Sequence, residues 1–439
     1  MAATTQDALT GQVADTTADG RGVITGTGKT IFLDGAIGGE TVSYRVRKRK
    51  RNYDEAELVE VLEPSPERVA ARCSVFGVCG GCALQHVEAT AQLRLKESVL
   101  FDNLQRIGGL EPDRVLAPIT GPQWGYRRKA RLGVKYVAKK GRVLVGFRER
   151  HAPYVTDTPA CETLDPAIGQ RLPALAELIQ QLSLQARIPQ VEVAIGDNGV
   201  ALVFRVLDEP TENDLDLLRQ FAADTGFFCY LQTGGPDTVA SLPGSPAPEA
   251  LHYGPGPEGL ELEFQPTDFV QVNQAVNQQM VARAIELLEP TPDMRLLDLF
   301  CGLGNFSLAL AQAGATVVGL EGSTAMVDRA TANAARNGIK TASFAAADLA
   351  KSEPLAVLGE QQFDSVLLDP PRAGAAAVLD AVAALKPERI LYVSCHPGTL
   401  ARDAQRLCSE LGYRLSAAGV IDMFPQTAHV EAMALFTRA

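Results

Sequence analysis

The chain has 439 residues, too many for one compact core, and a soft prior of about 150 residues per domain predicts two to four domains. Its 46% hydrophobic and 21% charged residues are typical of a soluble globular protein and exclude disordered, collagen-like and coiled-coil chains. A formal net charge of −11 argues, taken alone, against a nucleic-acid partner, and eight cysteines are too few for a disulfide scaffold.

The N-terminal residues carry neither the basic region nor the apolar stretch of a secretory signal, and no apolar run approaches the roughly 18 residues that cross a bilayer. The chain is therefore expected to be cytoplasmic, with no membrane partner. In a reducing compartment, clustered cysteines serve as metal ligands or catalysts more often than as disulfides.

Residues 1–65 are predicted to form the first domain. Strand-like runs alternate with glycine-containing turns, a pattern typical of a small β-barrel, and these runs lie at 22–25, 30–33, 41–46 and 57–62. Residues 45–51 place six basic side chains in seven positions, which predicts a basic, solvated loop on this domain. Pro64 and Pro66 then mark a linker.

Three thiols, Cys73, Cys79 and Cys82, lie close together in the sequence, and Cys161 is the natural fourth ligand. Glycines between the second and third thiols let this segment fold around an ion or a cluster. Four thiolates suit zinc and a [4Fe–4S] cluster almost equally well. Because zinc ribbons usually carry two Cys-x-x-Cys pairs and this chain has only one, the pattern favours iron–sulfur.

Basic and aromatic residues gather in the next part of the chain. A helix is predicted over 94–107, and Gly108-Gly109 ends it. Residues 121–150 contain ten Lys or Arg against one acid, interleaved with aromatic rings. Basic groups that neutralise phosphates and rings that stack on splayed bases predict a surface that binds an RNA loop. Strand-like runs complete a central α+β domain over 66–267, from which the helix near 94–107 could pack on the last domain.

Residues 268–439 are predicted to form an α/β domain. A helix over 273–288 leads into near-continuous apolar strands that alternate with helices, at 295–300, 316–320, 363–368 and 389–394. This alternation predicts a parallel sheet covered by helices on both faces.

The first of these strands leads into Gly302 and Gly304, which would let the backbone approach a ligand at a helix N-terminus. A nicotinamide dinucleotide is disfavoured, because Ser307 stands where its fingerprint needs a third glycine. Acidic residues at successive strand ends suit a cationic nucleoside such as S-adenosylmethionine better than a pyrophosphate, and these are Asp298, Glu321, Asp348 and Asp369.

Cys395 follows the last of these strands and would share one crevice with Asp369 and the glycine loop. A thiolate there could attack an electron-poor carbon such as uracil C6, which makes C5 nucleophilic toward a methyl group. Glu431 is a candidate base for the C5 proton. A cysteine with only a packing role is the alternative, and chemistry alone leaves it open.

Four motifs together resemble the RNA uracil-5-methyltransferases, at residues 298–307, 368–374, 393–403 and 424–431. The resemblance implies a Rossmann-like class I methyltransferase domain, in which Cys395 is the nucleophile, Glu431 the proton-abstracting base and Asp369 the residue that orients the uracil. It also implies that S-adenosylmethionine is bound by Gln271, Phe300, Asn305, Glu321, Asp348 and Asp369.

Residues 73–86 are similar to the iron–sulfur branch of that family, which implies a structural [4Fe–4S] cluster held by Cys73, Cys79, Cys82 and Cys161. The N-terminal barrel resembles a TRAM domain, an OB-like RNA-binding module. The resemblance therefore implies an α/β protein made of this β-barrel, a central α+β iron–sulfur and RNA-binding domain, and the methyltransferase domain.

This combination resembles the bacterial enzymes that methylate a uracil of 23S ribosomal RNA at C5, and it implies a monomer that acts on a loop uridine. Three alternatives remain open. They are the same chemistry on transfer RNA, a non-catalytic RNA-binding iron–sulfur protein, and a zinc-dependent RNA-binding module.

Overall fold

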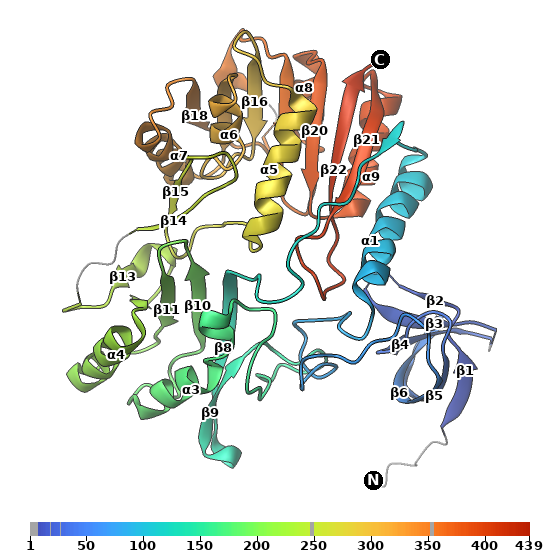
Figure 1. Cartoon of the computed structure of the whole chain (residues 1–439), viewed down its shortest axis with the longest axis vertical. Helices are drawn as coiled ribbons and strands as arrows, with labels where there is room; N and C mark the ends of the chain where they lie inside the picture. Colours follow the sequence, from blue (N-terminus) through green and yellow to red (C-terminus); the bar gives the residue numbers. More distant parts are fainter. Residues whose placement is uncertain (1–7, 18, 27, 246–249, 352–354) are drawn as a thin grey trace.

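The computed structural model of the protein describes residues 8–17, 19–26, 28–245, 250–351 and 355–439 (Figure 1). The described residues form three large sheets, and a two-stranded hairpin lies in the sequence between the central sheet and the main strands of the third sheet. Residues 1–7 of the first predicted domain lie outside the described residues. None of the described helices is long and apolar enough to cross a lipid bilayer.

The N-terminal strands form one mixed sheet in the order β1-β5-β6-β4-β3-β2. Buried and exposed side chains alternate along them, and Val13, Ile24, Leu33 and Tyr44 belong to a small core of their own. The predicted strands are confirmed, whereas closure of the sheet into a barrel stays a prediction. The strands are β1 (Leu9–Gln12), β2 (Asp15–Thr16), β3 (Arg21–Ile24), β4 (Thr30–Asp34), β5 (Thr41–Arg49) and β6 (Tyr53–Glu63).

The basic run at 45–51 was predicted to be a solvated loop, and for residues 45–49 this prediction was wrong, whereas Lys50 and Arg51 lie beyond the strand. Residues up to Arg49 continue β5, because the buried alternation of that strand extends through Val46. The basic side chains then lie opposite acids on β6, with Arg45 across from Glu57 and Lys48 across from Glu55. Opposite charges at facing positions stabilise an antiparallel pair, so this part of the run is strand and partly neutralised.

The central sheet has the order β13-β12-β11-β10-β8-β9. Helices α3 and α4 pack on it through Leu175, Ile179 and Leu218. Its strands are β8 (Lys129–Val137), β9 (Arg142–Gly146), β10 (Gln190–Ile195), β11 (Val200–Arg205), β12 (Phe228–Gln232) and β13 (Val239–Ser241). Its helices are α2 (Pro166–Gly169), α3 (Leu172–Gln181), α4 (Glu212–Thr225) and the short η2 (Ala138–Lys140) and η3 (Pro236–Thr238). The hairpin β14 (Leu251–Tyr253) and β15 (Leu262–Phe264) follows.

The C-terminal sheet has the order β18-β17-β16-β19-β20-β22-β21-β7. The strands from β18 to β20 are parallel, and β22 runs antiparallel to both of its neighbours. The strands are β16 (Arg295–Leu299), β17 (Thr316–Glu321), β18 (Ala342–Ala346), β19 (Ser365–Leu368), β20 (Arg389–Ser394), β21 (Tyr413–Ile421), β22 (Glu431–Arg438) and β7 (Arg114–Val115).

Helices cover both faces of this sheet, as predicted for an α/β domain. Successive residues of β16 point to opposite sides, so Leu296 joins one core and Leu297 the other. On the first side lie α5 (Gln274–Leu288), α6 (Ser307–Gln312) and α7 (Thr324–Arg336). On the second side lie α1 (Ala89–Asn103), α8 (Leu379–Ala384) and α9 (Pro397–Ser409), and the short η4 (Ala356–Leu358) precedes β19 (Figure 1).

Helix α1 (Ala89–Asn103) begins five residues before the predicted start at 94, because the Glu88 carboxylate accepts hydrogen bonds from the free N–H groups of Thr90 and Ala91. It continues into a π-helical turn, η1 (Leu104–Gly108), that packs on the C-terminal sheet together with α9. The next strand, β7, pairs with β21 at the sheet edge. The chain thus enters the third sheet early and returns to it after residue 288.

Candidate active site

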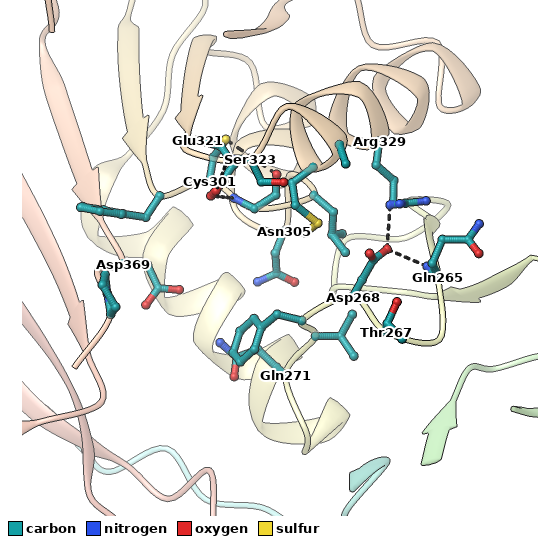
Figure 2. A pocket seen from close by; sticks show the side chains of 18 of the residues that line it. Gln265, Thr267, Asp268, Gln271, Cys301, Asn305, Glu321, Ser323, Arg329 and Asp369 are labelled. Carbon is teal, nitrogen blue, oxygen red and sulfur yellow. Dashed lines mark hydrogen bonds and ion pairs between the residues drawn. The ribbon is translucent and has the colours of Figure 1, made fainter. Parts of the chain in front are cut away.

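A cavity of about 1000 Å³ lies outside the carboxyl ends of β16, β17, β19 and β20. Seven of the predicted site residues line this one cavity: Gln271, Phe300, Asn305, Glu321, Asp369, Cys395 and Glu431. They come from loops that are far apart in the sequence and meet because parallel strands end at the same edge. Figure 2 shows Gln271, Asn305 and Asp369 approaching the cavity from different segments.

Asp348 is absent from this lining. It follows β18, is exposed, accepts a hydrogen bond from Ala350 N and lies near Lys351. Its role in binding a cofactor stays a prediction.

The glycine loop after β16 makes a sharp turn beside Glu321. Phe300, Gly302 and Gly304 all have positive φ, at 66°, 55° and 96°. The turn brings Gly302 N within 3.2 Å of Glu321 Oε2, while Ser323 N donates to Oε1 at 2.9 Å. The carboxylate is therefore held by backbone donors at the cavity wall, oriented before any ligand arrives.

Asn305 is fixed by two buried neighbours. Its Oδ1 accepts hydrogen bonds from Tyr253 Oη at 3.0 Å and Asn277 Nδ2 at 2.9 Å, and its Nδ2 donates to Asn277 Oδ1 at 3.0 Å. The orientation of the amide is thus set by a reciprocal amide pair. Sequence patterns could not reveal this pair, because Tyr253 and Asn277 come from β14 and α5.

Asp298 lies behind the glycine loop, where it accepts a hydrogen bond from Ser307 Oγ. Its side chain is buried, and its Oδ1 has no partner among the described residues. Burial, with a smaller contribution from Glu321, raises the pKa of Asp298 to about 7. Below neutral pH the Asp298 carboxyl group is therefore mostly protonated, and in that form it supports the glycine loop.

An Asp298→Asn variant tests this protonation. The folded protein holds a proton on Asp298 that the unfolded chain loses near pH 4, so the free energy of unfolding falls as the pH rises from about 4 to about 7. Asparagine removes that dependence. Denaturant unfolding at several pH values is expected to show the variant gaining stability relative to wild type across this window, and a constant difference would contradict the assignment.

Cys395 lies between β20 and α9. The next residue, His396, caps α9 by accepting a hydrogen bond from Thr399 N at its Nδ1. Burial, followed by the nearby carboxylates of Glu431 and Asp369, raises the pKa of Cys395, and Arg372 opposes this effect. The unliganded site therefore favours the thiol over the thiolate.

Two carboxyl groups face this thiol from different strands. Asp369 is partly buried, and burial, then Glu431 and Asp298, raise its pKa well above the usual range. Glu431 is the first residue of β22 and is 7% exposed, with its Oε1 3.6 Å from His429 Nε2. One thiol, one carboxyl group with a raised pKa and a second carboxyl group thus line the same cavity, a set able to attack an electrophile, donate a hydrogen bond and move a proton.

The cavity mouth contains residues that the sequence patterns missed. Arg329 of α7 forms an ion pair with Asp268 at 2.6 Å, and Gln265 N donates to the same carboxylate at 2.7 Å (Figure 2). Phe269, in the same loop, lines the cavity while its side chain is 73% exposed. No spacing rule connects Asp268 with Arg329, because the pair joins a loop to a helix about 60 residues later.

The four predicted ligand cysteines line a second, small cavity between the cysteine segment and the end of β9, together with Phe147, Thr158 and Thr163. Burial raises the pKa of Cys82 to about 11, and the neighbouring Cys161 and Cys79 add to this effect. Gly81 N donates to Cys79 Sγ at 3.4 Å, the type of contact that stabilises a thiolate. Among the described residues, however, no three His, Cys, Asp or Glu side chains are placed to hold a single metal ion.

The predicted basic surface at 121–150 is more neutral than its composition suggests. Acids from other segments pair with many of its cations: Arg128 with Asp197, Lys129 with Glu192, Lys140 and Arg142 with Asp157, and Arg150 with Asp34. The sequence could not show these partners because they lie outside the segment. Arg131, Lys135, Lys139 and Arg148 remain exposed.

Comparison with known proteins places these features in context. Residues 258–439 match the family model described as tRNA (Uracil-5-)-methyltransferase. The chain is 52% identical over 423 residues to a protein of Alkalilimnicola ehrlichii named 23S rRNA (uracil(1939)-C(5))-methyltransferase RlmD, covering 96% of this chain and 94% of that protein. It is 48% identical to the protein of the same name from Hahella chejuensis, with coverages of 99% and 98%.

The fold also has a counterpart among solved structures. The crystal structure of Pyrococcus abyssi tRNA (uracil-54, C5)-methyltransferase in complex with S-adenosyl-L-homocysteine superposes with a TM-score of 0.75 over 98% of this chain and 99% of that one, at 24% sequence identity. The two chains share their architecture over nearly their full lengths.

Proposed function

The chain belongs to the RlmD-type RNA uracil-5-methyltransferases and is an S-adenosylmethionine-dependent RNA (uracil-C5)-methyltransferase, and on this premise we propose that it methylates one uridine of 23S ribosomal RNA. The relatives' names specify uracil 1939, and we propose the corresponding uridine as the target. The observation that carries the proposal is the gathering of Cys395, Asp369, Glu431 and four predicted cofactor residues around one cavity.

We propose a covalent mechanism for this cavity. Cys395 gives up its proton to solvent, its thiolate attacks C6 of a flipped-out uracil, and the C5=C6 π electrons move toward the C4 carbonyl as an enolate, which makes C5 nucleophilic. Asp369 keeps its proton and donates a hydrogen bond that orients the base. S-adenosylmethionine, when bound, would supply the electrophilic methyl group to C5, with its S–CH3 bond broken and S-adenosylhomocysteine as the leaving thioether. Glu431 then removes the C5 proton, the C5=C6 bond re-forms, and the C6–S bond breaks to release Cys395 as a thiolate.

The substrate is tested with unmodified ribosomal RNA and transfer RNA, each supplied with a tritiated methyl donor. We expect label at one uridine of 23S rRNA, located by mass spectrometry of nuclease fragments. Label in transfer RNA alone would reject the ribosomal substrate. Binding of RNA without any transfer to either would instead favour a non-catalytic RNA-binding protein.

Glu321 is proposed to accept the ribose hydroxyls of the methyl donor, since its carboxylate is held at the end of β17 by Gly302 N and Ser323 N. A Glu321→Gln variant keeps the shape but loses the charge. Because charge-assisted hydrogen bonds contribute about 1.5–3 kcal/mol, we expect the Kd for S-adenosylmethionine to rise about 10- to 100-fold. Titration calorimetry measures this change, and an unaltered Kd would exclude the role.

We also propose that Cys73, Cys79, Cys82 and Cys161 hold a [4Fe–4S] cluster. The support is chemical: the four thiols line one small cavity, and cysteine thiolates are the usual ligands of such a cluster. Anaerobically purified protein is expected to be brown, with broad absorption near ~400 nm, and to contain four irons. A colourless protein with one zinc would contradict this proposal. The TRAM assignment, monomeric state and cytoplasmic location stay predictions.

A further inference from the structure

The loop between β21 and β22 leads directly into Glu431. Most of the hydrogen bonds and ion pairs that hold this loop come from residues outside the methyltransferase sheet. We propose that the cysteine segment and helix α1 act as a clamp on this loop and thereby position Glu431 for removal of the C5 proton. The clamp is defined here by residues 82–84 and by Gln92 and Lys96 of α1. The inference rests on the proposed function, because it takes Glu431 as the base.

Gln426 is the centre of the clamp. Its backbone has a φ of 68°, which is unusual for a residue with a side chain, and it is 3% exposed. Its carbonyl oxygen accepts hydrogen bonds from Ala83 N and Leu84 N, both at 3.0 Å. Its own N–H donates to Gln92 Oε1 at 3.0 Å, and its side-chain Oε1 accepts from Gln92 Nε2 at 3.1 Å.

Gln92 completes the connection between the two segments. The same Nε2 lies within hydrogen-bond distance of Leu84 O at 3.1 Å and Val87 O at 2.8 Å. Gln92 is 2% exposed, so water cannot replace these partners. A single buried amide therefore joins the cysteine segment, α1 and the loop before Glu431.

The start of the loop is held by a buried ion pair. Lys96 Nζ lies 2.6 Å from Asp422 Oδ1 and donates to Phe424 O at 3.0 Å. Tyr126 Oη, from the central segment, donates to Pro425 O at 2.8 Å. With Gln426, three successive loop residues are therefore anchored by groups that lie more than 290 positions earlier in the chain.

The clamp is continuous with the cysteine cavity. Ala83 and Leu84 follow Cys82, whose carbonyl oxygen accepts a hydrogen bond from Arg150 at 2.8 Å. The position of Cys82 thus fixes the two N–H groups that hold Gln426. Four residues separate Gln426 from Glu431, so a shift of the cysteine segment moves the turn that carries the base.

This arrangement predicts a defect in one step of the reaction. Cys395 follows β20 and the S-adenosylmethionine loop follows β16, so loosening the clamp leaves attack and methyl transfer nearly intact. Removal of the C5 proton depends on Glu431 and slows. A displacement of about 1 Å in a catalytic group costs on the order of 100-fold in rate, which sets the scale of the effect.

The test uses the complete, cluster-containing protein with a Gln92→Met substitution, which keeps the side-chain length but removes every hydrogen bond of the amide. Gln220→Met, at an exposed position of α4, is the control. With RNA carrying 5-fluorouridine, fluorine cannot leave as a cation, so the reaction stops after methyl transfer and adduct formation reports the early steps. With RNA carrying tritium at C5, release of tritium reports removal of the C5 proton.

We expect Gln92→Met to form the fluorouridine adduct within about twofold of wild type, to release tritium about 10- to 100-fold more slowly, and to accumulate adduct on ordinary RNA. Equal slowing of both reactions would show a general structural role and overturn the inference, as would unchanged tritium release. If the wild-type protein itself forms no adduct with fluorouridine RNA, the result rejects the covalent mechanism on which the clamp proposal rests.

A second measurement applies even if Gln92→Met does not fold. Hydrogen exchange on the wild-type protein follows the amide of Gln426 before and after a chelator treatment, and iron content measured before and after shows whether the proposed cluster was present and was removed. We expect its protection to fall at least about tenfold when the centre is lost, while amides in β16 stay protected. Unchanged protection at Gln426 would overturn the link between the cysteine cavity and the base.

Discussion

A Glu431→Gln variant is expected to stop the reaction after methyl transfer, leaving the protein covalently bound to its RNA. The amide occupies the same place at the start of β22 but cannot accept the C5 proton, so the C6–S bond cannot break. Loss of a positioned general base costs about 10²- to 10⁴-fold in turnover. The adduct should survive denaturing electrophoresis and contain one added methyl group by mass spectrometry.

A matched control is Glu410→Gln, since Glu410 caps the far end of α9 with its carboxylate 65% exposed. It should turn over at the wild-type rate and leave no adduct. Normal turnover in Glu431→Gln would reject Glu431 as the base. Slow turnover without any adduct would place its role before methyl transfer.

The second large effect is expected for Cys395→Ala, which should lower turnover by about 10⁴- to 10⁶-fold and abolish the adduct with 5-fluorouridine RNA. Without the thiol, C5 of uracil stays unreactive toward a methyl donor. Binding of S-adenosylmethionine should persist within about twofold, because the glycine loop and Glu321 are unaltered.

Cys408→Ala provides the control for Cys395→Ala. Cys408 lies near the end of α9, outside the cavity lining, and its loss should leave both turnover and the adduct unchanged. Full activity in Cys395→Ala would end the covalent mechanism. Residual activity above about one percent of wild type would show that a group other than Cys395 activates the uracil.

The sequence predicted the parts of the molecule that depend on local periodicity and on motifs. Near-continuous apolar strands identified β16, β17, β19 and β20, and the parallel order then brought Glu321, Asp369 and Cys395 to one edge. The turn through Gly302 and Gly304 was likewise foreseeable, because few residues other than glycine adopt such backbone angles.

Contacts between distant segments were not predictable from those patterns. The basic run was assigned to a loop because charge suggested solvent, whereas the register with β6 places it in a strand. The Asp268–Arg329 pair and the partners of Gln426 depend on tertiary packing alone. Asp348 is the opposite case. Its position after a strand predicted a role in the cavity, but its side chain does not line the cavity.

The early entry of β7 into the third sheet has a consequence for any attempt to isolate the catalytic half. A fragment beginning near residue 258 would lose β7 and leave the backbone of β21 open along one side (Figure 1). It would also uncover the apolar surface that Leu100 and Leu104 bury. An unpaired, apolar strand edge is a template for pairing with another copy, so the excised half would self-associate. Residues 89–119, which contain α1, η1 and β7, therefore cover a strand edge and an apolar surface that the isolated methyltransferase domain would expose.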